Sequence, residues 1–557
     1  MLLQSSLGWV AGLTTLSCLL DPILAADMAA WKTRSVYQTM TDRFSRPDGS
    51  VTAPCNTTAG LYCGGTWQGT IKELDYIQGM GFDAIMISPI VKNIGGRVSY
   101  GEAYHGYWPL DLYALNDHFG TEQDLHDLIT EVHARGMFVL MDTVINNMAY
   151  MTHGQNPADH IDYSVFTPFN NQDFFHPYCK ITNWNNYTDA QLCQTGDNQV
   201  ALPDLFTEHE DVQKLLEDWA TGVIKKFNID GLRIDAVKSV TPSFVRKFGD
   251  TVGGFMTGEE YERNSSIICQ WQHDYIRSMP NYPMYFSMLD AFTQGKIASL
   301  ADQIEEMKNL CSDVTEMVSF SENHDVARIG GLTSDLAIAK TILTFTLLFD
   351  GIPMVYQGQE QHLKGIATPL NREAIWLTKF DTQAPLYQLT KVLNAIRRHA
   401  LTLDPNFVNI PSYPIYRGGS EIAISKGVQG RQIVTVLTNQ GEKGGAYTLL
   451  LPASFNAMTG VTEIISCTNY TVSFEGELVV NMNKGEPRVF FPTQLMPGSG
   501  LCGFSDKNQS YTELKTGHKS TTISSGSSLR TGFLRDSSST SAVLVAVMLG
   551  VMALLNL

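Results

Sequence analysis

The chain has few basic residues and no Lys/Arg-rich run. Its 39 Lys and Arg stand against 56 Asp and Glu, which gives a net charge of −17. A negative protein repels phosphate backbones and anionic headgroups, so we do not expect nucleic acid as a partner. Charged residues make up 17% and hydrophobic residues 43% of the chain, values typical of globular proteins. The 557 residues exceed one ordinary domain, and several domains are expected.

The nine cysteines include no CxxC pattern, which argues against a zinc site. Cys18 lies near the N-terminus, and the other eight pair by sequence proximity into four predicted disulfides: Cys55–Cys63, Cys179–Cys193, Cys269–Cys311 and Cys467–Cys502. Passage through a secretory lumen would also allow glycosylation at five Asn-x-Ser/Thr acceptors: Asn56, Asn186, Asn264, Asn469 and Asn508.

The N-terminus is typical of a secretory signal peptide. Residues 1–26 contain no Lys or Arg, carry an apolar run at 7–20 and end in two alanines. We predict cleavage after this segment, and a short buried helix is the alternative.

The C-terminus has no hydrophobic run long enough to span a bilayer. Residues 505–541 hold 11 Ser and 6 Thr and indicate a linker, and the final apolar run, 542–557, is shorter than the roughly 20 residues that a spanning helix needs. Small residues around Gly526, a polar spacer and this tail are the order of a GPI-attachment signal. We predict a linker at 503–526, removal of 527–557, and a protein held by a GPI lipid at the cell surface, on the plasma membrane or the cell wall.

The body of the chain alternates predicted strands with amphipathic helices, which indicates a parallel sheet. The expected strands are residues 36–40, 82–87, 137–141, 231–234, 318–320, 352–356 and one around Phe255. Carboxylates follow four of them, at Asp142, Asp235, Glu259 and the segment 322–325. Reactive groups of an eight-stranded β/α barrel gather at the carboxyl ends of its strands, so we predict a (β/α)8 barrel; four helix N-caps are the alternative.

Two segments depart from this alternation. A long aromatic stretch with few helical signals predicts a small inserted domain at 147–205, so the barrel would comprise 27–146 and 206–407. Alternating strands and turns then predict an all-β sandwich domain at 408–502.

Three carboxylates at one barrel mouth supply what cleavage of an acetal needs. Asp235, Glu259 and Asp325 together could supply a nucleophile, a general acid/base and a third charge that orients the sugar and stabilises an oxocarbenium-like transition state. Arg233 lies two residues before Asp235, on the same face of the strand, where it would keep that carboxylate ionised. Sugar hydroxyls and faces could be contacted by His324 and by a nearby group of aromatic residues, Tyr104, Tyr107 and Trp108.

The short motifs around these residues resemble those of the α-amylase family, glycoside hydrolase family 13. They are DTVINN (142–147), LPDL (202–205), GLRIDAVK (231–238), GEE (258–260) and ENHD (322–325). The resemblance to secreted fungal members covers about residues 30–502. It implies a barrel, a small domain B and an all-β domain C, and a retaining reaction on α-1,4-glucans or maltooligosaccharides.

The resemblance also implies roles for individual residues. Asp235 matches the nucleophile, Glu259 the general acid/base and Asp325 the transition-state stabiliser. Substrate contacts are implied for His105, Tyr107, Trp108, Arg233, Lys238, His324 and Arg372. A Ca²⁺ site between barrel and domain B is implied for Asn146, Gln191, Asp204 and Ser239, and Gln191 replaces a family glutamate, which predicts weaker calcium binding.

Three cleft positions differ from the family pattern. Asn147 and Ser239 replace histidines, and Thr368 replaces an aspartate. With the tail signal, these differences resemble GPI-anchored fungal homologues that act as 4-α-glucanotransferases on cell-wall α-glucan. We therefore expect a monomeric transferase with weak hydrolysis. The alternatives are a hydrolytic α-amylase and a wall-bound lectin, and the three intact carboxylates argue against the lectin.

Overall fold

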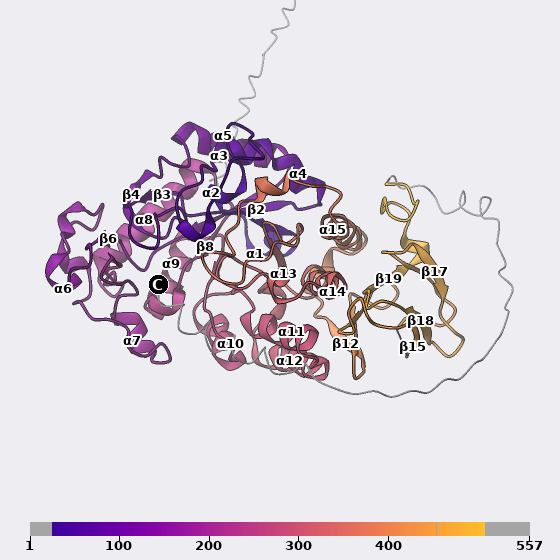
Figure 1. The fold of residues 1–557 in the computed structure, drawn as a ribbon. Coiled ribbons are helices and arrows are strands. Elements are labelled where there is room, and N and C mark those ends of the chain that lie inside the picture. Colours follow the sequence, from indigo (N-terminus) through magenta and orange to yellow (C-terminus); the bar gives the residue numbers. More distant parts are fainter. Residues whose placement is uncertain (1–24, 453, 507–557) are drawn as a thin grey trace, which may run out of the picture.

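The computed structural model describes residues 25–452 and 454–506 (Figure 1). Residues 1–24 of the predicted signal peptide, most of the predicted linker, Asn508, Gly526 and the apolar tail lie outside the described residues. Within them, the carbonyl of Ala26 accepts a hydrogen bond from the Phe255 N–H (2.8 Å). The last residue of the predicted signal segment therefore packs against the barrel.

The centre of the protein is a parallel sheet of seven strands in the order β10-β11-β1-β2-β5-β8-β9. Their bounds are β1 Val36–Gln38, β2 Ala84–Ile87, β5 Phe138–Thr143, β8 Gly231–Ile234, β9 Phe255–Gly258, β10 Val318–Phe320 and β11 Ile352–Tyr356. Both faces of a barrel strand are covered, so these segments are nearly continuous apolar runs. The strands predicted from sequence are all present, with ends shifted by up to two residues.

The sheet closes into a barrel through an eighth segment that is not a regular strand. Ser278 bridges Thr257 of β9, and Pro280 bridges Val318 of β10, both in parallel. Proline has no N–H to give to a ladder, so pairing stops at single bridges. The predicted barrel is confirmed, with this sixth position irregular.

Ten helices surround the barrel among the described residues. They are α3 Trp67–Lys72, α4 Leu74–Gly79, α5 Glu122–Ala134, α8 Glu210–Phe227, α9 Pro242–Val252, α10 Ser265–Asp274, α11 Tyr282–Thr293, α12 Ile297–Leu310, α14 Leu336–Leu348 and α15 Pro385–Leu403. Local signals set their ends: Thr121 and Asp124 form a capping box at α5, and Asn228 ends α8 in the left-handed region. Short helices lie in the loops: α1 Met28–Lys32, α2 Thr41–Phe44 and α13 Ile329–Leu332.

The segment 147–205 projects from the barrel and carries little regular structure (Figure 1). It contains the β6 Tyr150–Met151 and β7 Val200–Ala201 pair and helices α6 Pro157–His160 and α7 Tyr187–Leu192. Beside it, β3 Val91–Asn93 pairs with β4 Pro109–Leu115. All four predicted disulfides form, and Cys179–Cys193 closes part of this segment.

The C-terminal domain packs two antiparallel sheets against each other. One has the order β12-β13-β14-β19-β16-β17 and the other pairs β15 with β18. The bounds are β12 Tyr413–Arg417, β13 Glu421–Lys426, β14 Ile433–Thr438, β15 Tyr447–Leu451, β16 Gly460–Glu463, β17 Thr468–Thr471, β18 Leu478–Met482 and β19 Arg488–Pro492. Side chains of both sheets, including Val436 and Leu451, share one core.

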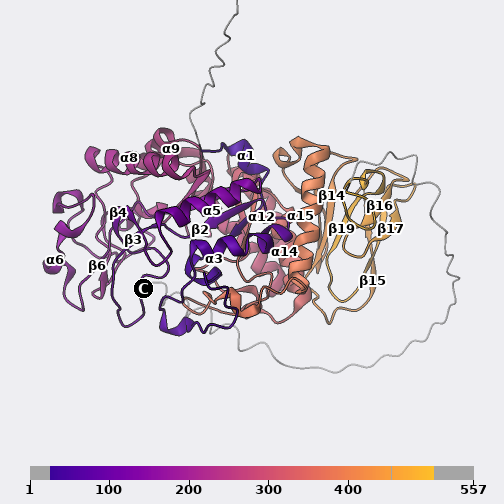
Figure 2. The same cartoon turned by 90° about the horizontal axis from the view of Figure 1, so that it is seen from above.

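The large C-terminal sheet is also covered on its other face, toward the barrel. Every residue of β13 and β14 is buried, because Ile424 and Leu437 face the barrel core while Ala423 and Val436 face the second sheet. Helices α14 and α15 lie between the barrel and this sheet (Figure 2).

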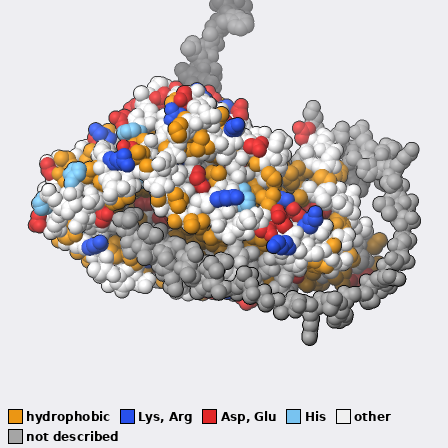
Figure 3. Space-filling view, viewed as in Figure 1, with side chains coloured by type: hydrophobic (Ala, Val, Ile, Leu, Met, Phe, Trp, Pro, Cys, Tyr) orange, Lys and Arg blue, Asp and Glu red, His pale blue; other side chains and the backbone are white. Residues whose placement is uncertain are grey.

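The described surface carries charges of both signs. On the face shown in Figure 3, Lys and Arg side chains are scattered among acidic and uncharged ones. No helix within residues 25–452 and 454–506 is both long and apolar enough to cross a bilayer.

Candidate active site

Arg233 joins the two carboxylates that were predicted to act as nucleophile and acid. It projects from β8, its side chain is 7% exposed, and its Nη1 lies 2.6 Å from Oδ1 of Asp235. Its Nη2 lies 3.0 Å from Oε2 of Glu259, at the end of the neighbouring strand β9. The same oxygen accepts the backbone N–H of Ala236 (3.2 Å). Ala236 has a φ of +46°, so the chain turns sharply directly after Asp235.

Asp142, at the end of β5, binds both Arg233 and Tyr107. It is 2% exposed, and its Oδ1 accepts from Arg233 (2.9 Å) while its Oδ2 accepts the Tyr107 hydroxyl (2.5 Å). Asp142 therefore holds both the guanidinium and the aromatic ring that is expected under the sugar. The sequence placed this carboxylate at a strand end but did not show that it acts through Arg233 and Tyr107.

Asp325 lies on the other side of the mouth, between two cationic or polar partners. Nη2 of Arg372 lies 3.0 Å from its Oδ1, and Nε2 of His324 lies 3.0 Å from its Oδ2. The same His324 nitrogen is 2.8 Å from the Tyr107 hydroxyl, and Nδ1 lies 3.0 Å from Nε2 of Gln38. Tyr107 and His324 thus connect Asp325 to Asp142 across the mouth. The predicted residues at the two strand ends form one network.

One expected carboxylate of this loop points elsewhere. Glu322, at the end of β10, is 1% exposed and pairs with buried Arg328 (3.2 Å). It also accepts the Ile329 N–H (2.8 Å). Glu322 stabilises its own loop, so of the carboxylates that follow β10 only Asp325 joins the mouth.

The protonation of three side chains follows from their surroundings. Burial, opposed by Arg233 and reinforced by the charges of Glu259 and Asp142, raises the pKa of Asp235 to about 8. The prediction that Arg233 keeps this carboxylate ionised was therefore wrong, because burial outweighs the guanidinium. Burial acts in the same direction on Asp325, but His324 and Arg372 outweigh it and hold its pKa well below the usual range. Burial lowers the pKa of His105 well below 6.5, and its Nδ1 accepts the Tyr107 N–H (3.0 Å). Neutral His105 therefore carries its proton on Nε2, where it can be donated.

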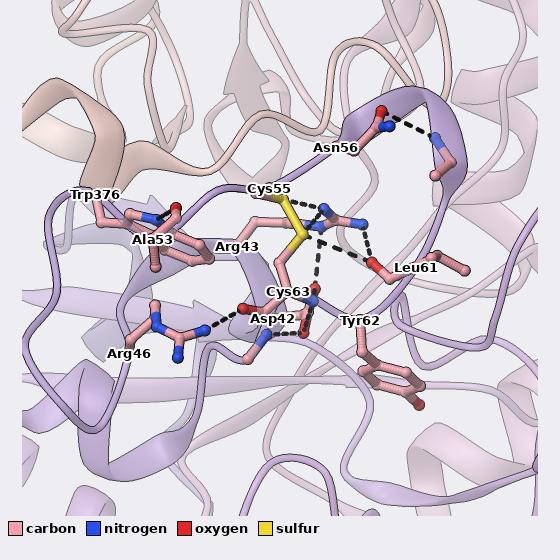
Figure 4. Close-up of a disulfide and its surroundings, with 12 residues drawn as sticks. Asp42, Arg43, Arg46, Ala53, Cys55, Asn56, Leu61, Tyr62, Cys63 and Trp376 are labelled. Carbon is pink, nitrogen blue, oxygen red and sulfur yellow. Dashed lines mark hydrogen bonds and ion pairs between the residues drawn. A yellow bond between two sulfur atoms is a disulfide. The ribbon is translucent and has the colours of Figure 1, made fainter.

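The Cys55–Cys63 disulfide lies beside Arg43, which connects it to the mouth residues (Figure 4). Arg43 directs Nη1 at both sulfur atoms and donates Nη2 to the Leu61 carbonyl (2.8 Å). Its guanidinium carbon lies 4.0 Å from the ring centroid of Tyr104, whose hydroxyl is 3.4 Å from Nη1 of Arg372.

The structure also shows the surroundings of the three residues that depart from the family pattern. Asn147 is 5% exposed, and its amide donates to the Met148 carbonyl (3.2 Å). Ser239 is 2% exposed and ends the short 3-10 helix η4 Val237–Ser239. Thr368 is exposed and makes a long hydrogen bond to the His324 carbonyl (3.4 Å). Each replacement thus leaves a smaller side chain at its position.

The predicted calcium ligands were tested by the state of their oxygen atoms. Oδ1 and Nδ2 of Asn146 and Oδ1 of Asp204 are buried and have no well-formed hydrogen bond to any described residue, although the two residues lie on paired backbone segments. Thr207 and Thr241 bond to each other (2.9 Å) and bring the Asp204 loop beside the Ser239 loop. Orphaned buried oxygens are what a hard cation needs, so these residues fit calcium.

The other oxygen of Asp204 already has a partner. Nδ1 of His176 lies 2.6 Å from Oδ2 of Asp204. Burial lowers the pKa of His176, but Asp204 and Glu208 outweigh burial and raise that pKa to about 9. The described residues hold no group of three or more His, Cys, Asp or Glu side chains that could bind a metal, and the predicted set includes only one such side chain, Asp204.

Two residues at the mouth were missed by sequence reasoning. Glu260 and Tyr187 bond to each other (2.8 Å), and Glu260 also pairs with Lys238 (3.1 Å). The sequence signal for Glu260 was a second carboxylate directly after Glu259. No signal pointed to Tyr187, which lies 73 residues away.

Comparison with known proteins identifies the class. The family model for the α-amylase catalytic domain matches residues 38–386, and the model for α-amylase domain C matches residues 414–510. The chain therefore belongs to the α-amylase family, and it is an α-glucan-active glycosidase.

Individual relatives give the same result. α-Amylase 2 of Schwanniomyces occidentalis is 41% identical over 86% of this chain and 93% of its own length. α-Amylase 1 of Lipomyces kononenkoae is 43% identical over 85% of this chain and 76% of its own. The structure of an α-amylase from Malbranchea cinnamomea superposes with a TM-score of 0.82 at 44% identity, covering 86% of this chain and all of that one.

Proposed function

We propose that this protein is a retaining α-amylase that cleaves α-1,4 bonds inside starch, glycogen and maltooligosaccharides. The observation that carries the proposal is Arg233, which holds Asp235 and Glu259 together within 3.0 Å of one guanidinium. A nucleophile and an acid held side by side suit retention, because both must reach the same glycosidic bond. The relatives named α-amylase at 36–43% identity support hydrolysis.

The proposed reaction has two steps. The ionised form of Asp235, paired with Arg233, attacks the anomeric carbon while Glu259 protonates the departing oxygen, which leaves a glycosyl ester on Asp235. Water then gives a proton to Glu259 and opens the ester, so the α configuration is retained. Asp325 stabilises the oxocarbenium-like transition state, and His105, His324 and Arg372 contact the sugar hydroxyls, with Tyr107 beneath the ring. Trp108 and Lys238 line the rest of the cleft.

Calcium is proposed as the structural cofactor. Asn146 and Asp204 would hold it through their orphaned oxygens, with Gln191 and the Ser239 backbone completing the set. The ion would join the 147–205 segment to the barrel. Because Gln191 brings no charge, Gln191→Glu should raise the calcium affinity, measured by calorimetry on chelator-treated protein.

A second candidate is 4-α-glucanotransferase activity, with an oligosaccharide replacing water as acceptor. It is favoured by Asn147, whose amide donates to a backbone carbonyl, and by Ser239, which is buried at the end of η4. Neither side chain supplies the imidazole that the family pattern has there, so the positions of acceptor and water could differ from those in hydrolases.

Chromatography of the products from one defined maltooligosaccharide separates the candidates. Only shorter products are expected from a hydrolase, and longer ones from a transferase. Asn147→His should raise total turnover with little change in the ratio of transfer to hydrolysis, whereas Ser239→His should shift the ratio. A ratio that changes only with Asn147→His would contradict this assignment.

Cell-surface attachment through a GPI lipid remains part of the proposal, with Gly526 as the attachment residue and a monomer as the functional unit. It rests on the small residues, spacer and apolar tail of the sequence. Release by a phosphatidylinositol-specific lipase of protein lacking residues 542–557 is expected, and mature surface protein that keeps this tail would contradict it. The four glycosylation sites among the described residues are all exposed, which suits modification.

A further inference from the structure

Glu260 is a buried carboxylate directly beside the general acid. It is 1% exposed, and only one of its oxygens is used: Oε1 accepts the Tyr187 hydroxyl (2.8 Å) and lies 3.1 Å from Nζ of Lys238. Its Oε2 is buried and has no hydrogen-bond partner among the described residues. A buried carboxylate with an unpaired oxygen lowers stability relative to an apolar side chain. A role other than stability therefore has to account for it.

The two partners of Glu260 come from different parts of the chain. Tyr187 is the first residue of α7, in the projecting 147–205 segment, and Lys238 lies in η4, which follows β8. The Lys238 ammonium also lies 4.8 Å from the centroid of the Tyr187 ring. Burial and Glu260 raise the Tyr187 pKa, so its hydroxyl stays protonated and donates. Glu260 therefore fastens the projecting segment to two barrel loops.

The position of this group relative to the reaction follows from Glu259. A general acid must lie on the side of the bond where the leaving oxygen departs. The Val237 N–H donates to the Glu259 carbonyl (3.0 Å) and the Ala236 N–H to its Oε2 (3.2 Å), so η4, which carries Lys238, lies beside the general acid. We infer that Lys238 and Tyr187 lie on the side of the leaving chain, which is also the side where an acceptor enters. Lys238 and Tyr187 are both only partly buried, so they present surface there.

A free lysine at this position would have other partners. Its flexible stem could carry the ammonium toward the carboxylates of the mouth, and Glu259 precedes Glu260 directly in sequence. Pairing with Glu260 and the Tyr187 ring restricts that movement and leaves one or more ammonium protons for a hydroxyl of the saccharide.

We propose that Glu260 is a positioning residue that fixes Lys238 and Tyr187 as the binding surface for the leaving and acceptor chain. This inference rests on the proposed retaining mechanism. It concerns one side of the bond only, so Glu260 should matter for substrates whose leaving group is a saccharide and not for those whose leaving group is too small to reach Lys238.

The test compares two donors that differ in the leaving group. Maltohexaose departs with a saccharide, whereas α-maltotriosyl fluoride departs with fluoride. Glu260→Gln keeps an acceptor for Tyr187 but removes the charge that holds Lys238. We expect kcat/KM for maltohexaose to fall about tenfold, mainly through KM, and kcat/KM for the fluoride to change less than about twofold.

Controls separate this role from general damage. Glu262→Gln removes a carboxylate from the same loop that, within the described residues, accepts only the Asn264 N–H (2.8 Å). Its charge acts on Glu260 and Tyr187 without bonding to them, so kcat/KM for both donors should change by less than about twofold. Tyr187→Phe keeps the Glu260–Lys238 pair and should give a smaller change with the same selectivity, so it replaces Glu260→Gln if that variant does not fold. Equal losses for both donors, or none, would overturn the proposal. A wild-type enzyme inactive on both donors would instead refute the proposed function.

Discussion

At the scale of single residues, Asp235 is destabilising in its ionised form. Burial raises its pKa from 3.8 to about 8, and the charges of Glu259 and Asp142 act in the same direction while Arg233 opposes them. The folded state then binds this proton more tightly than the unfolded chain. The contribution of this proton to the free energy of unfolding is fully present below about pH 4 and is lost as the pH rises through about 8.

Replacing Asp235 should expose this dependence. Asp235→Asn cannot ionise, and we expect the variant to be inactive. Its free energy of unfolding minus that of the wild type should increase as the pH rises from about 4 to about 8, because only the wild type must then ionise a buried carboxyl. Thermal unfolding of both proteins across this range measures it. Asp211→Asn, at a side chain 74% exposed, is the control and should follow the wild type. A difference that is constant with pH would contradict the assignment.

At the scale of an element, the loop closed by Cys55–Cys63 is organised around Arg43. This side chain is fully buried and contacts the disulfide, the Leu61 carbonyl, Asp42 (3.1 Å) and the Tyr104 ring. Asp42 in turn accepts the N–H groups of Cys63 and Gly64. A buried charge pair contributes little net stability, but loss of one partner leaves the other charge unpaired.

Arg43→Leu should therefore destabilise the protein by about 3–5 kcal/mol, because it leaves the Asp42 carboxylate buried without its cation. Asp42→Asn combined with Arg43→Leu should recover part of that loss. Urea unfolding of the wild type, both single variants and the double variant gives the coupling free energy. Strictly additive losses would show that the two side chains do not act as a pair.

At the scale of the whole molecule, the barrel and the C-terminal domain share one buried ion pair. Asp350, after α14, lies 2.6 Å from Nζ of Lys426 in β13, and its oxygens also accept the N–H and hydroxyl of Ser412. Both charged side chains are at most 5% exposed. Together with the second buried face of the large sheet, this contact makes the domain boundary a continuous core.

Asp350→Asn should weaken the two domains together. It leaves the Lys426 ammonium buried without a counter-charge, and we expect a loss of about 3–5 kcal/mol in a single unfolding transition. Combining it with Lys426→Met should restore much of the stability. Differential scanning calorimetry distinguishes the outcomes, and a separate early transition of the C-terminal domain would contradict a shared core.

Much of the fold could be predicted because it follows from local chemistry. Apolar runs such as Val318–Phe320 and Ile352–Tyr356 match the observed strands residue by residue, and cysteines close in sequence are the ones that pair. Burial on both faces of β13 and β14 could not be predicted from their sequences, because it depends on a helix layer and a second sheet from elsewhere in the chain. The irregular closure at Pro280 was likewise visible only after folding.

The sequence by itself determined which carboxylates stand at strand ends and that Arg233 shares a face with Asp235, since both follow from strand periodicity. Only the tertiary structure decided that Arg233 also reaches Glu259, that Glu322 turns to Arg328, and that Glu260 holds Tyr187. The physical reason is that hydrogen bonds and ion pairs act over about 3 Å, and side chains distant in sequence come that close only through packing.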